Sequence, residues 1–278
     1  MNIPNLKDII IKLREMTGSG VALCKKAIET SEGCLESAVN WLREQGHAQA
    51  AKVANRATGE GLISLAFDDK KGVLVELGCE TDYVANNEEF GKLAHELADT
   101  ALKNGISTAA ELNQHAAEAI TAVIAKIKEN MVVKNVILLE GEHIVGYVYR
   151  TVANNVPDIG KKGCLIAYKA SEVKAQTKSL VREIAMHIIA HETKHLTGKD
   201  IPSEFIKKEQ DIMRVKMLNE GKKEDMIDKI LKGQEASLYK QHALLDQPFF
   251  KDPSVSVEQI CKKSGVDIVE FKVLSLGE

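Results

Sequence analysis

The segment HETKH, residues 191 to 195, has the residue types and the spacing of a zinc site. Two histidines four residues apart share one face of a helix, so His191 and His195 could bind a zinc ion, and Glu192 could activate a water bound to it. This pattern is typical of metallopeptidases. Ile201 stands where the longer form of the motif has its third ligand, and a lysine lies inside the motif. We therefore interpret HETKH as a chance match at the end of a helix, and we expect no metal or other cofactor.

A second candidate is the segment CETDYVANNEEF, residues 79 to 90, which follows the apolar run GVLVELG. Asp82 and Tyr83 come where that strand should end, so an acid and an aromatic side chain are expected at its edge. The carboxylate could serve catalysis, or the pair could anchor another protein, since aromatic residues often carry the binding energy of an interface. A helix-capping loop with a packed tyrosine is the alternative. We expect Asn86 or Asn87 to cap the next helix.

The common catalytic and nucleotide-binding motifs are absent from the sequence. It contains no G-x-x-x-x-G-K-[ST] phosphate loop, no G-x-G-x-x-G after a strand and no G-x-S-x-G nucleophile elbow. The segment TGSG, residues 17 to 20, is expected to be a turn between two helices. The sequence therefore favours a protein that binds a partner and is not an enzyme.

Composition and charge narrow the class of partner. The chain has 278 residues, with 37 Lys and Arg against 40 Asp and Glu, and no basic cluster that could follow a phosphate backbone, so direct binding to nucleic acid is not expected. No apolar run approaches the roughly 20 residues of a membrane span, and the first residues do not resemble a signal peptide. Five scattered cysteines without C-x-x-C spacing indicate a reducing compartment. We expect a cytoplasmic protein without a membrane partner.

Apolar residues recur at helical spacing in the first part of the chain and predict a three-helix module over residues 1–52. The three stripes are Leu6, Ile9, Ile10 and Leu13, then Cys24, Ala27 and Ile28, then Leu35, Ala38, Val39 and Leu42. A module of this size buries little surface and is marginal on its own. The Ala-rich, Gly-terminated segment that follows, AQAAKVANRATGEG, predicts a helix that leads to a hinge.

The middle of the chain predicts an α+β fold with antiparallel sheets, because the apolar spacing changes to that of strands. LISLAF and VLVELG read as strands, and they precede a helix that carries Phe90 and a second helix near residues 109–128. NVILLEG and IVGYVYR read as a further pair of strands. The final alternating segment, DIVEFKVLSL, is expected to return to the second sheet.

The same region contains a diverged internal repeat. GCLIAYKASEVKAQTKSL echoes the earlier strand, polar connector and helix, and Gly72 and Gly163 precede Phe90 and Leu180 by 18 and 17 residues. The repeat predicts two core subdomains side by side. The first would comprise residues 53–135, and the second residues 136–202 together with 239–278.

Residues 203–238 are rich in charge, have sparse apolar positions, and predict an inserted antiparallel helical hairpin, a short coiled coil. Its two helices would meet near Gly221. Each would reach roughly 25 Å from the body, at about 1.5 Å per residue.

Four motifs, in order along the chain, resemble those of the bacterial elongation factor Ts family. LREMTGSGVALCKKAIE is similar to the family's N-terminal signature, CETDYVANNEEF to its Thr-Asp-Phe-Val-Ala motif, AMHIIA to its Met-His motif, and QPFFKDPSVSVEQI to its C-terminal stretch. The resemblance implies a guanine-nucleotide exchange factor for elongation factor Tu. It also implies a small N-terminal domain like ubiquitin-associated domains, two repeated core subdomains and a protruding helical hairpin.

The resemblance further implies which residues bind elongation factor Tu, in its GDP-bound and nucleotide-free states. Asp82 and Tyr83 would insert into the GTPase domain and disturb its magnesium and phosphate site. The N-terminal module would dock on the same domain, and the region of residues 143–150 would meet another domain, with one or two copies of the chain in the complex. The implied binding residues are Met16, Thr17, Gly18, Gly20, Lys25, Thr81, Asp82, Tyr83, Val84, Ala85 and His143.

The chain departs from the family pattern at several positions. Tyr83 stands where Phe is usual, and its hydroxyl must find water or a partner group when it is buried. Leu23 replaces a common acid, Asn86 a common base and Thr193 a common proline. The segment TVANNVPDIGKKGCLIAY carries an insertion near Asn154.

Overall fold

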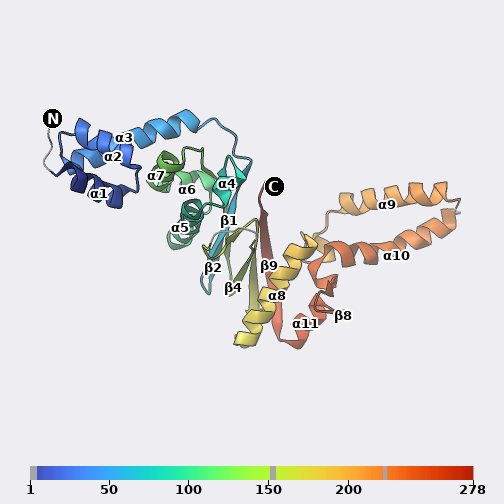
Figure 1. The fold of residues 1–278 in the computed structure, drawn as a ribbon. Coiled ribbons are helices and arrows are strands. Elements are labelled where there is room, and N and C mark those ends of the chain that lie inside the picture. Colours follow the sequence, from blue (N-terminus) through green and yellow to red (C-terminus); the bar gives the residue numbers. More distant parts are fainter. Residues whose placement is uncertain (1–4, 151–154, 222–223, 278) are drawn as a thin grey trace.

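The computed structural model describes residues 5–150, 155–221 and 224–277, so part of the insertion near Asn154 lies outside the described residues. Figure 1 shows an N-terminal helical module at one end, a β-sheet core in the middle and two long helices that project from the other end. No described helix has the length and apolar character needed to cross a membrane.

The N-terminal module consists of α1 (Leu6–Thr17), α2 (Val21–Thr30) and α3 (Leu35–Val53). The predicted stripes form its small core, and Leu13, Cys24 and Ile28 are fully buried there. Helix α3 continues well beyond this core, and Val53 at its end packs into the core of the first sheet. The predicted Ala-rich helix is therefore the second half of α3, which links the module to the body.

The first sheet has the strand order β3-β2-β1-β5 and is antiparallel throughout. Its strands are β1 (Glu60–Phe67), β2 (Lys71–Cys79), β3 (Val132–Glu140) and β5 (Ile159–Gly160). One face is covered by helices that follow β2, and Phe90 is fully buried between them and the sheet. These helices are α4 (Asp82–Ala85), α5 (Glu88–Asn104), α6 (Ala109–His115) and α7 (Ala117–Ile127).

The second sheet has the order β4-β6-β9 and is also antiparallel. Its strands are β4 (His143–Tyr149), β6 (Lys162–Ala170) and β9 (Val266–Ser275), so the last strand returns to this sheet as predicted. Helices α8 (Ala175–His191) and α11 (Val257–Lys263) cover its outer face. The turn η2 (Leu244–Asp246) and the pair β7 (Pro248–Phe249) and β8 (Asp252–Ser256) complete this side. The α+β fold with antiparallel sheets is thus confirmed.

The predicted pairing of NVILLEG with IVGYVYR is wrong, because β3 pairs with β2 and β4 pairs with β6. The link between β3 and β4 is held against the β1–β2 turn, where Gly141 N donates to Lys70 O and Ile144 N donates to Asp69 O. The chain therefore crosses from one sheet to the other and does not form a hairpin. Strand β3 also runs across the expected division between residues 135 and 136.

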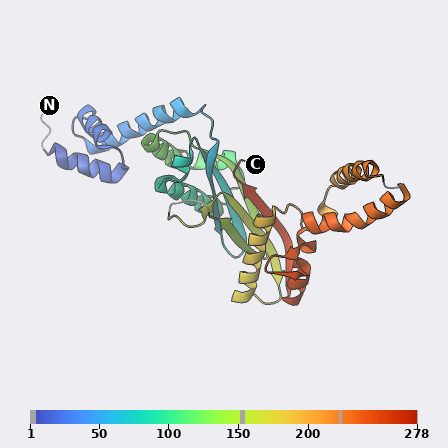
Figure 2. The ribbon, with the colours of Figure 1, turned by 45° about the vertical axis from the view of Figure 1, so that its right-hand side comes forward.

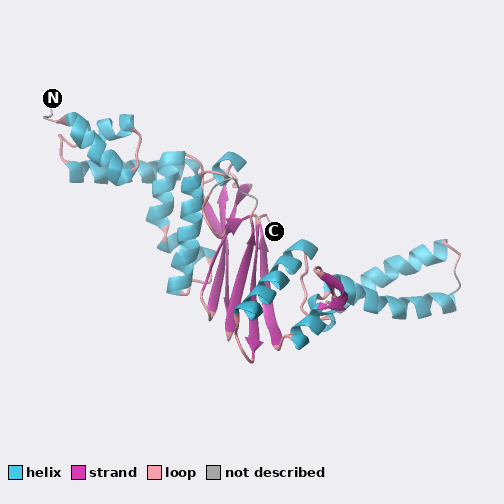
Figure 3. Cartoon of the chain, turned by 60° about the horizontal axis from the view of Figure 1, so that its bottom comes forward, coloured by secondary structure: helices cyan, strands magenta, loops and turns pink. Residues whose placement is uncertain are grey.

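The two sheets pack face to face around a layer of apolar side chains, and helices cover both outer faces (Figures 2 and 3). Glycines let the sheets approach closely. A Cβ on Gly72 would lie 2.4 Å from Leu165 Cδ2, and a Cβ on Gly163 would lie 2.6 Å from Leu74 Cδ2. Each repeat therefore supplies a glycine that accommodates a leucine of the other repeat.

Two helices project from the second half of the core, α9 (Ser203–Asn219) and α10 (Glu224–His242), after the short turn η1 (Gly198–Asp200). They pack on each other through a thin apolar seam in which Met217, Ile227 and Leu231 are buried. The seam fits the sparse apolar positions of the sequence, although Ile212 is exposed on the outside of α9.

Candidate partner-binding site

The segment after β2 presents Asp82 and Tyr83 on a single turn of helix, α4. Tyr83 is 80% exposed, whereas the next two residues, Val84 and Ala85, are buried in the core of the first sheet. A large aromatic side chain that is exposed to water while the residues next to it are buried is typical of an interface anchor. The alternative of a packed tyrosine is therefore wrong.

The two ends of this turn are fixed by caps. The Thr81 hydroxyl oxygen accepts from Val84 N at 3.3 Å, and the Asn87 side chain accepts from Glu89 N at 2.8 Å to start α5. The cap of α5 is thus Asn87, one of the two predicted residues. Cys79 lies beneath the turn. Burial of its thiol, and to a smaller extent the nearby Glu129 carboxylate, raises the pKa of the thiol to about 12. Cys79 is therefore an inert core residue.

The implied N-terminal binding residues cluster around the turn between α1 and α2. Met16 is 59% exposed, and Gly18 ends α1 in the left-handed region with φ 65°. The Thr17 hydroxyl donates to Leu13 O at 2.7 Å, and the carbonyl of Gly20 accepts from Leu23 N and Cys24 N in α2. Lys25 is exposed on α2, where it pairs with a glutamate one turn later.

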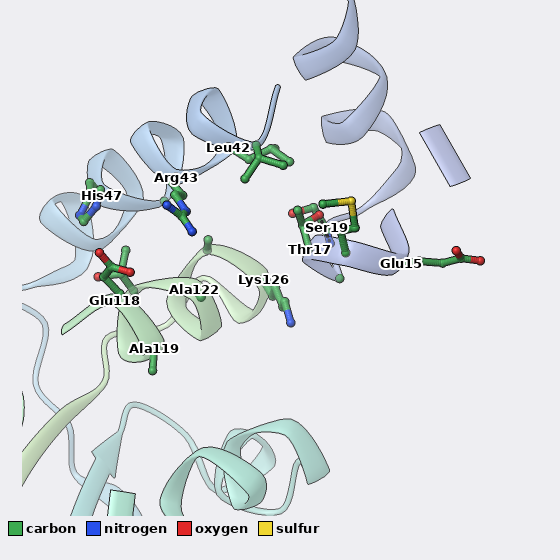
Figure 4. Close-up of a pocket in the computed structure, with 16 residues that line it drawn as sticks. Glu15, Thr17, Ser19, Leu42, Arg43, His47, Glu118, Ala119, Ala122 and Lys126 are labelled. Carbon is green, nitrogen blue, oxygen red and sulfur yellow. Dashed lines mark hydrogen bonds between the residues drawn. The ribbon is translucent and has the colours of Figure 1, made fainter. Parts of the chain in front are cut away.

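A pocket of about 610 Å³ separates this turn from the core, between α3 and α7. Figure 4 shows Lys126 extending from α7 near the Thr17–Ser19 turn, and Arg43, His47 and Glu118 lining the same space. Lys126 also forms an ion pair with Glu89 in the first turn of α5, close to α4. One lysine thus contacts both the N-terminal turn and the helix that follows Asp82 and Tyr83.

His143 lies at the opposite end of the core from Asp82. Its Nδ1 is 3.2 Å from Asp69 Oδ2 in the β1–β2 turn, and its ring centroid is 5.5 Å from that of Tyr168. The whole of β2 separates this turn from α4, about 30 Å at roughly 3.4 Å per residue. The candidate residues therefore form two separate surfaces, one around α4 and the N-terminal turn and the other at the start of β4.

The zinc interpretation of HETKH is not supported by the geometry. Helix α8 ends at His191, and Glu192 has a left-handed backbone with φ 51°. His195 lies beyond the helix, in a bridge with Ala243, so the two histidines do not share a helical face. Glu192 instead bonds Lys162 Nζ at 2.5 Å, and that bond lowers the pKa of the carboxyl. Among the described residues, no three acidic, His or Cys side chains are grouped as a metal site.

The structure brings together AMHIIA and QPFFKDP around a buried histidine, His187. Its Nδ1 accepts from Phe250 N, so the other ring nitrogen, Nε2, donates to Gln247 Oε1 at 2.8 Å. The Thr193 hydroxyl donates to the same oxygen at 2.9 Å. This arrangement requires the neutral imidazole and gives the two motifs a structural role.

We expect the protein to lose stability as the pH falls below about 6.5, the usual value for histidine. Burial lowers the pKa of His187, and His191, which stacks on it with 4.1 Å between ring centroids, acts in the same direction. A histidine with a lowered folded-state pKa stabilises the protein above the unfolded-state pKa, and this contribution is lost as the pH falls toward the folded-state pKa. Urea unfolding at about pH 7.5 and about pH 5.5 measures the loss.

Replacing His187 by glutamine should reduce this loss between the two pH values. The control His115→Gln removes an exposed histidine on α6 and should keep the full pH dependence of the wild type. An equal loss of stability in the wild type and in His187→Gln would contradict the assignment.

Three residues of the α4 region were missed by sequence reasoning. Glu129 bonds the backbone directly before the turn, Glu80 bonds the backbone of Asn130, and Lys126 pairs with Glu89 of α5 beside the N-terminal turn. Their partners lie dozens of positions away in the sequence, and the residues themselves resemble ordinary surface charges. No periodicity or motif marks them, so only the fold identifies them.

Comparison with known proteins gives one consistent result. A family model described as "Elongation factor TS" matches residues 80–278. Elongation factor Ts of Rhodopseudomonas palustris (strain BisA53) is 37% identical, over 97% of this chain and 91% of its own. The protein of the same name from Aquifex aeolicus (strain VF5) is 38% identical, over 96% of both chains. That from Paracoccus denitrificans (strain Pd 1222) is 35% identical, over 96% of this chain and 90% of its own.

Proposed function

The chain belongs to the elongation factor Ts family of translation factors, and from that membership we propose that it is a guanine-nucleotide exchange factor for elongation factor Tu. It would bind the GDP-bound and nucleotide-free GTPase in the cytoplasm, without direct contact to nucleic acid or membrane. The observation that carries the proposal is the exposed Asp82–Tyr83 pair on a turn whose next two residues are buried.

In the proposed mechanism, the Asp82–Tyr83 pair inserts into the GTPase domain next to its magnesium and phosphate site. The carboxylate repels phosphate and competes for cation contacts, while the tyrosine ring supplies apolar contact area. The tyrosine hydroxyl would need a hydrogen-bond partner once it is buried. The pair thus weakens nucleotide contacts in exchange for contacts with the factor.

Such exchange is a coupling between two binding events, not a bond-making reaction. Nucleotide and factor each weaken the binding of the other by the same free energy, and every 1.4 kcal/mol of coupling changes nucleotide affinity about tenfold. The factor therefore binds the empty GTPase most tightly, and it accelerates exchange without being an enzyme in the usual sense.

The other candidate residues would supply affinity. The exposed N-terminal turn with Met16, together with Lys25, would dock on the same GTPase domain, and the His143 surface would contact a second domain of the partner. The length of β2 between the two surfaces supports contacts with two different domains of one partner.

Stopped-flow release of a fluorescent GDP analogue from elongation factor Tu, in buffer with excess magnesium, tests the proposal. Release should become faster as the concentration of the chain increases and should level off when the partner is saturated. A folded protein that leaves the release rate unchanged at all concentrations would refute the exchange function.

A further inference from the structure

The turn that presents Asp82 and Tyr83 is too short to hold its own shape. Helix α4 contains four residues, and helices of this length have no stability in water without external contacts. Its C-terminal half is fixed by buried residues, whereas Asp82 and Tyr83 face the solvent. The orientation of the pair therefore depends on what holds the backbone directly before it, at residues 80–81.

That backbone is held by one carboxylate from a distant part of the chain. Oε2 of Glu129 accepts from Glu80 N at 3.2 Å and from Thr81 N at 3.1 Å, and Oε1 accepts from the Thr81 hydroxyl at 2.7 Å. Bonds to an ionised acceptor are stronger than neutral ones. The bond from the hydroxyl also leaves its lone pairs free for the cap to Val84 N.

The contact is reciprocal, since the carboxylate of Glu80 in turn bonds the backbone next to Glu129. Oε1 of Glu80 accepts from Asn130 N at 2.7 Å and from Arg56 Nη1 at 3.4 Å. We call these four residues, Glu80, Thr81, Glu129 and Asn130, the clasp. Each of the two segments, residues 80–81 and residues 129–130, supplies one carboxylate to the backbone of the other. The two segments are therefore fixed in position relative to each other.

The clasp also joins the N-terminal module to the turn. Asn130, which is 7% exposed, donates through Nδ2 to Ala54 O at 3.2 Å and to Arg56 O at 2.8 Å, at the end of the connector after α3. Four residues earlier, Lys126 lies against Gly18 and pairs with Glu89. The segment from 126 to 130 thus contacts both the N-terminal turn and the backbone that leads into α4.

We propose that Glu129 is a positioning residue for nucleotide exchange, which holds Thr81 so that Asp82 and Tyr83 meet the partner in one orientation. This inference rests on the proposed exchange function. A preorganised turn loses less conformational freedom when it inserts. Loss of the clasp should therefore lower the maximal release rate at saturation, while affinity from the N-terminal turn and the His143 surface is retained.

The test measures GDP release from elongation factor Tu against factor concentration for wild type, Glu129→Gln and the control Glu111→Gln. Glu111 is exposed on α6, and its substitution removes the same charge. We expect Glu129→Gln to lower the maximal rate about tenfold, the size of one lost charge-assisted bond, with a half-saturating concentration within about twofold. Glu111→Gln should match wild type in both values.

Thr81 provides a second, independent pair of variants. Thr81→Val removes the hydroxyl and should lower the maximal rate, whereas Thr81→Ser keeps it and should restore most of the rate. Because the Glu129 carboxylate and the Thr81 hydroxyl hold the same turn and share one bond, the losses of Glu129→Gln and Thr81→Val should combine to less than their sum. Additive losses, or a Glu129→Gln rate equal to that of wild type, would overturn the proposal.

Two further measurements separate the possible failures. If Glu129→Gln lowers the melting temperature and the rate falls only with the folded fraction, the clasp is merely structural and the proposal is wrong. If wild type itself gives no acceleration, the exchange function fails, and amide hydrogen exchange then tests the positioning alone. The amides of Thr81 and Val84 should exchange faster in Glu129→Gln, and unchanged protection there would overturn the positioning role as well.

Discussion

With the double variant Asp82→Ala, Tyr83→Ala, the acceleration of GDP release from elongation factor Tu should be lower than with wild type by a factor of about 100 or more. This factor corresponds to about 2.7 kcal/mol of lost coupling. The reason is that both side chains face the solvent in the free protein, and Tyr83 is 80% exposed. Their contacts are therefore made only in the complex. Stopped-flow release at saturating factor measures the effect.

The same variant should fold normally, because neither side chain contributes to the core. Its melting temperature should remain within about 2 °C of wild type, as for most surface substitutions. A matched control is Asp267→Ala, Val269→Ala, which removes an exposed acid and an exposed apolar side chain from β9. Normal acceleration by the Asp82–Tyr83 variant, or an equal loss in the control, would contradict insertion of the pair.

The variant Gly72→Ala should lower the free energy of unfolding by about 2 kcal/mol, the usual cost of excess volume in a packed core. A Cβ at this position would lie 2.4 Å from Leu165 Cδ2 and 3.0 Å from Ile144 Cγ2. Leu165 is fully buried, so it has no free space into which to move. Urea unfolding gives the change in free energy.

Two further variants identify the cause of that loss. Gly59→Ala adds the same methyl group where no atom lies within 4 Å, and it should leave stability nearly unchanged. Leu165→Ala alone should cost about 3 kcal/mol. The double variant Gly72→Ala, Leu165→Ala should lose at least about 1 kcal/mol less than the sum, because the second change removes the clash. Strict additivity would show that the sheets adjust elsewhere.

Local patterns in the sequence predicted much of the fold. The three N-terminal helices, the repeated strand-and-helix units and the two long helices all follow from apolar spacing, since each element buries one face. The glycines at 72 and 163 were recognised as equivalent positions of a repeat. Their role at the interface of two sheets depends on packing, and that was visible only in the structure.

Long-range choices were less predictable. β3 and β4 have suitable strand patterns and a short connection, so local signals favour a hairpin. Contacts of residues 141–144 with the distant β1–β2 turn send them into different sheets. In the same way, the letters of HETKH satisfy a zinc motif, but α8 ends at its first histidine. A motif predicts chemistry only where the backbone places its residues on one face.

The candidate site likewise contains residues that local sequence predicts and residues that depend on long-range contacts. Tyr83 could be predicted as a binding residue because an aromatic after an apolar strand is unusual in a chain with 4% aromatic residues. Glu129 could not, because its role arises from bonds to residues 48 and 49 positions earlier. An exposed aromatic after a strand leaves a compositional signal, whereas a carboxylate that bonds a distant backbone resembles any surface carboxylate.

The packing of a leucine from each sheet against a glycine of the other sheet also constrains how the sequence can diverge. Gly72 accommodates Leu165 while Gly163 accommodates Leu74, so each half of the core carries one small and one large member of two cross-matched pairs. A change of size in one half is tolerated only with a matching change in the other. The two repeats are thus complementary in size, and we expect a chimera of two relatives to fold well only if both members of each pair match in size.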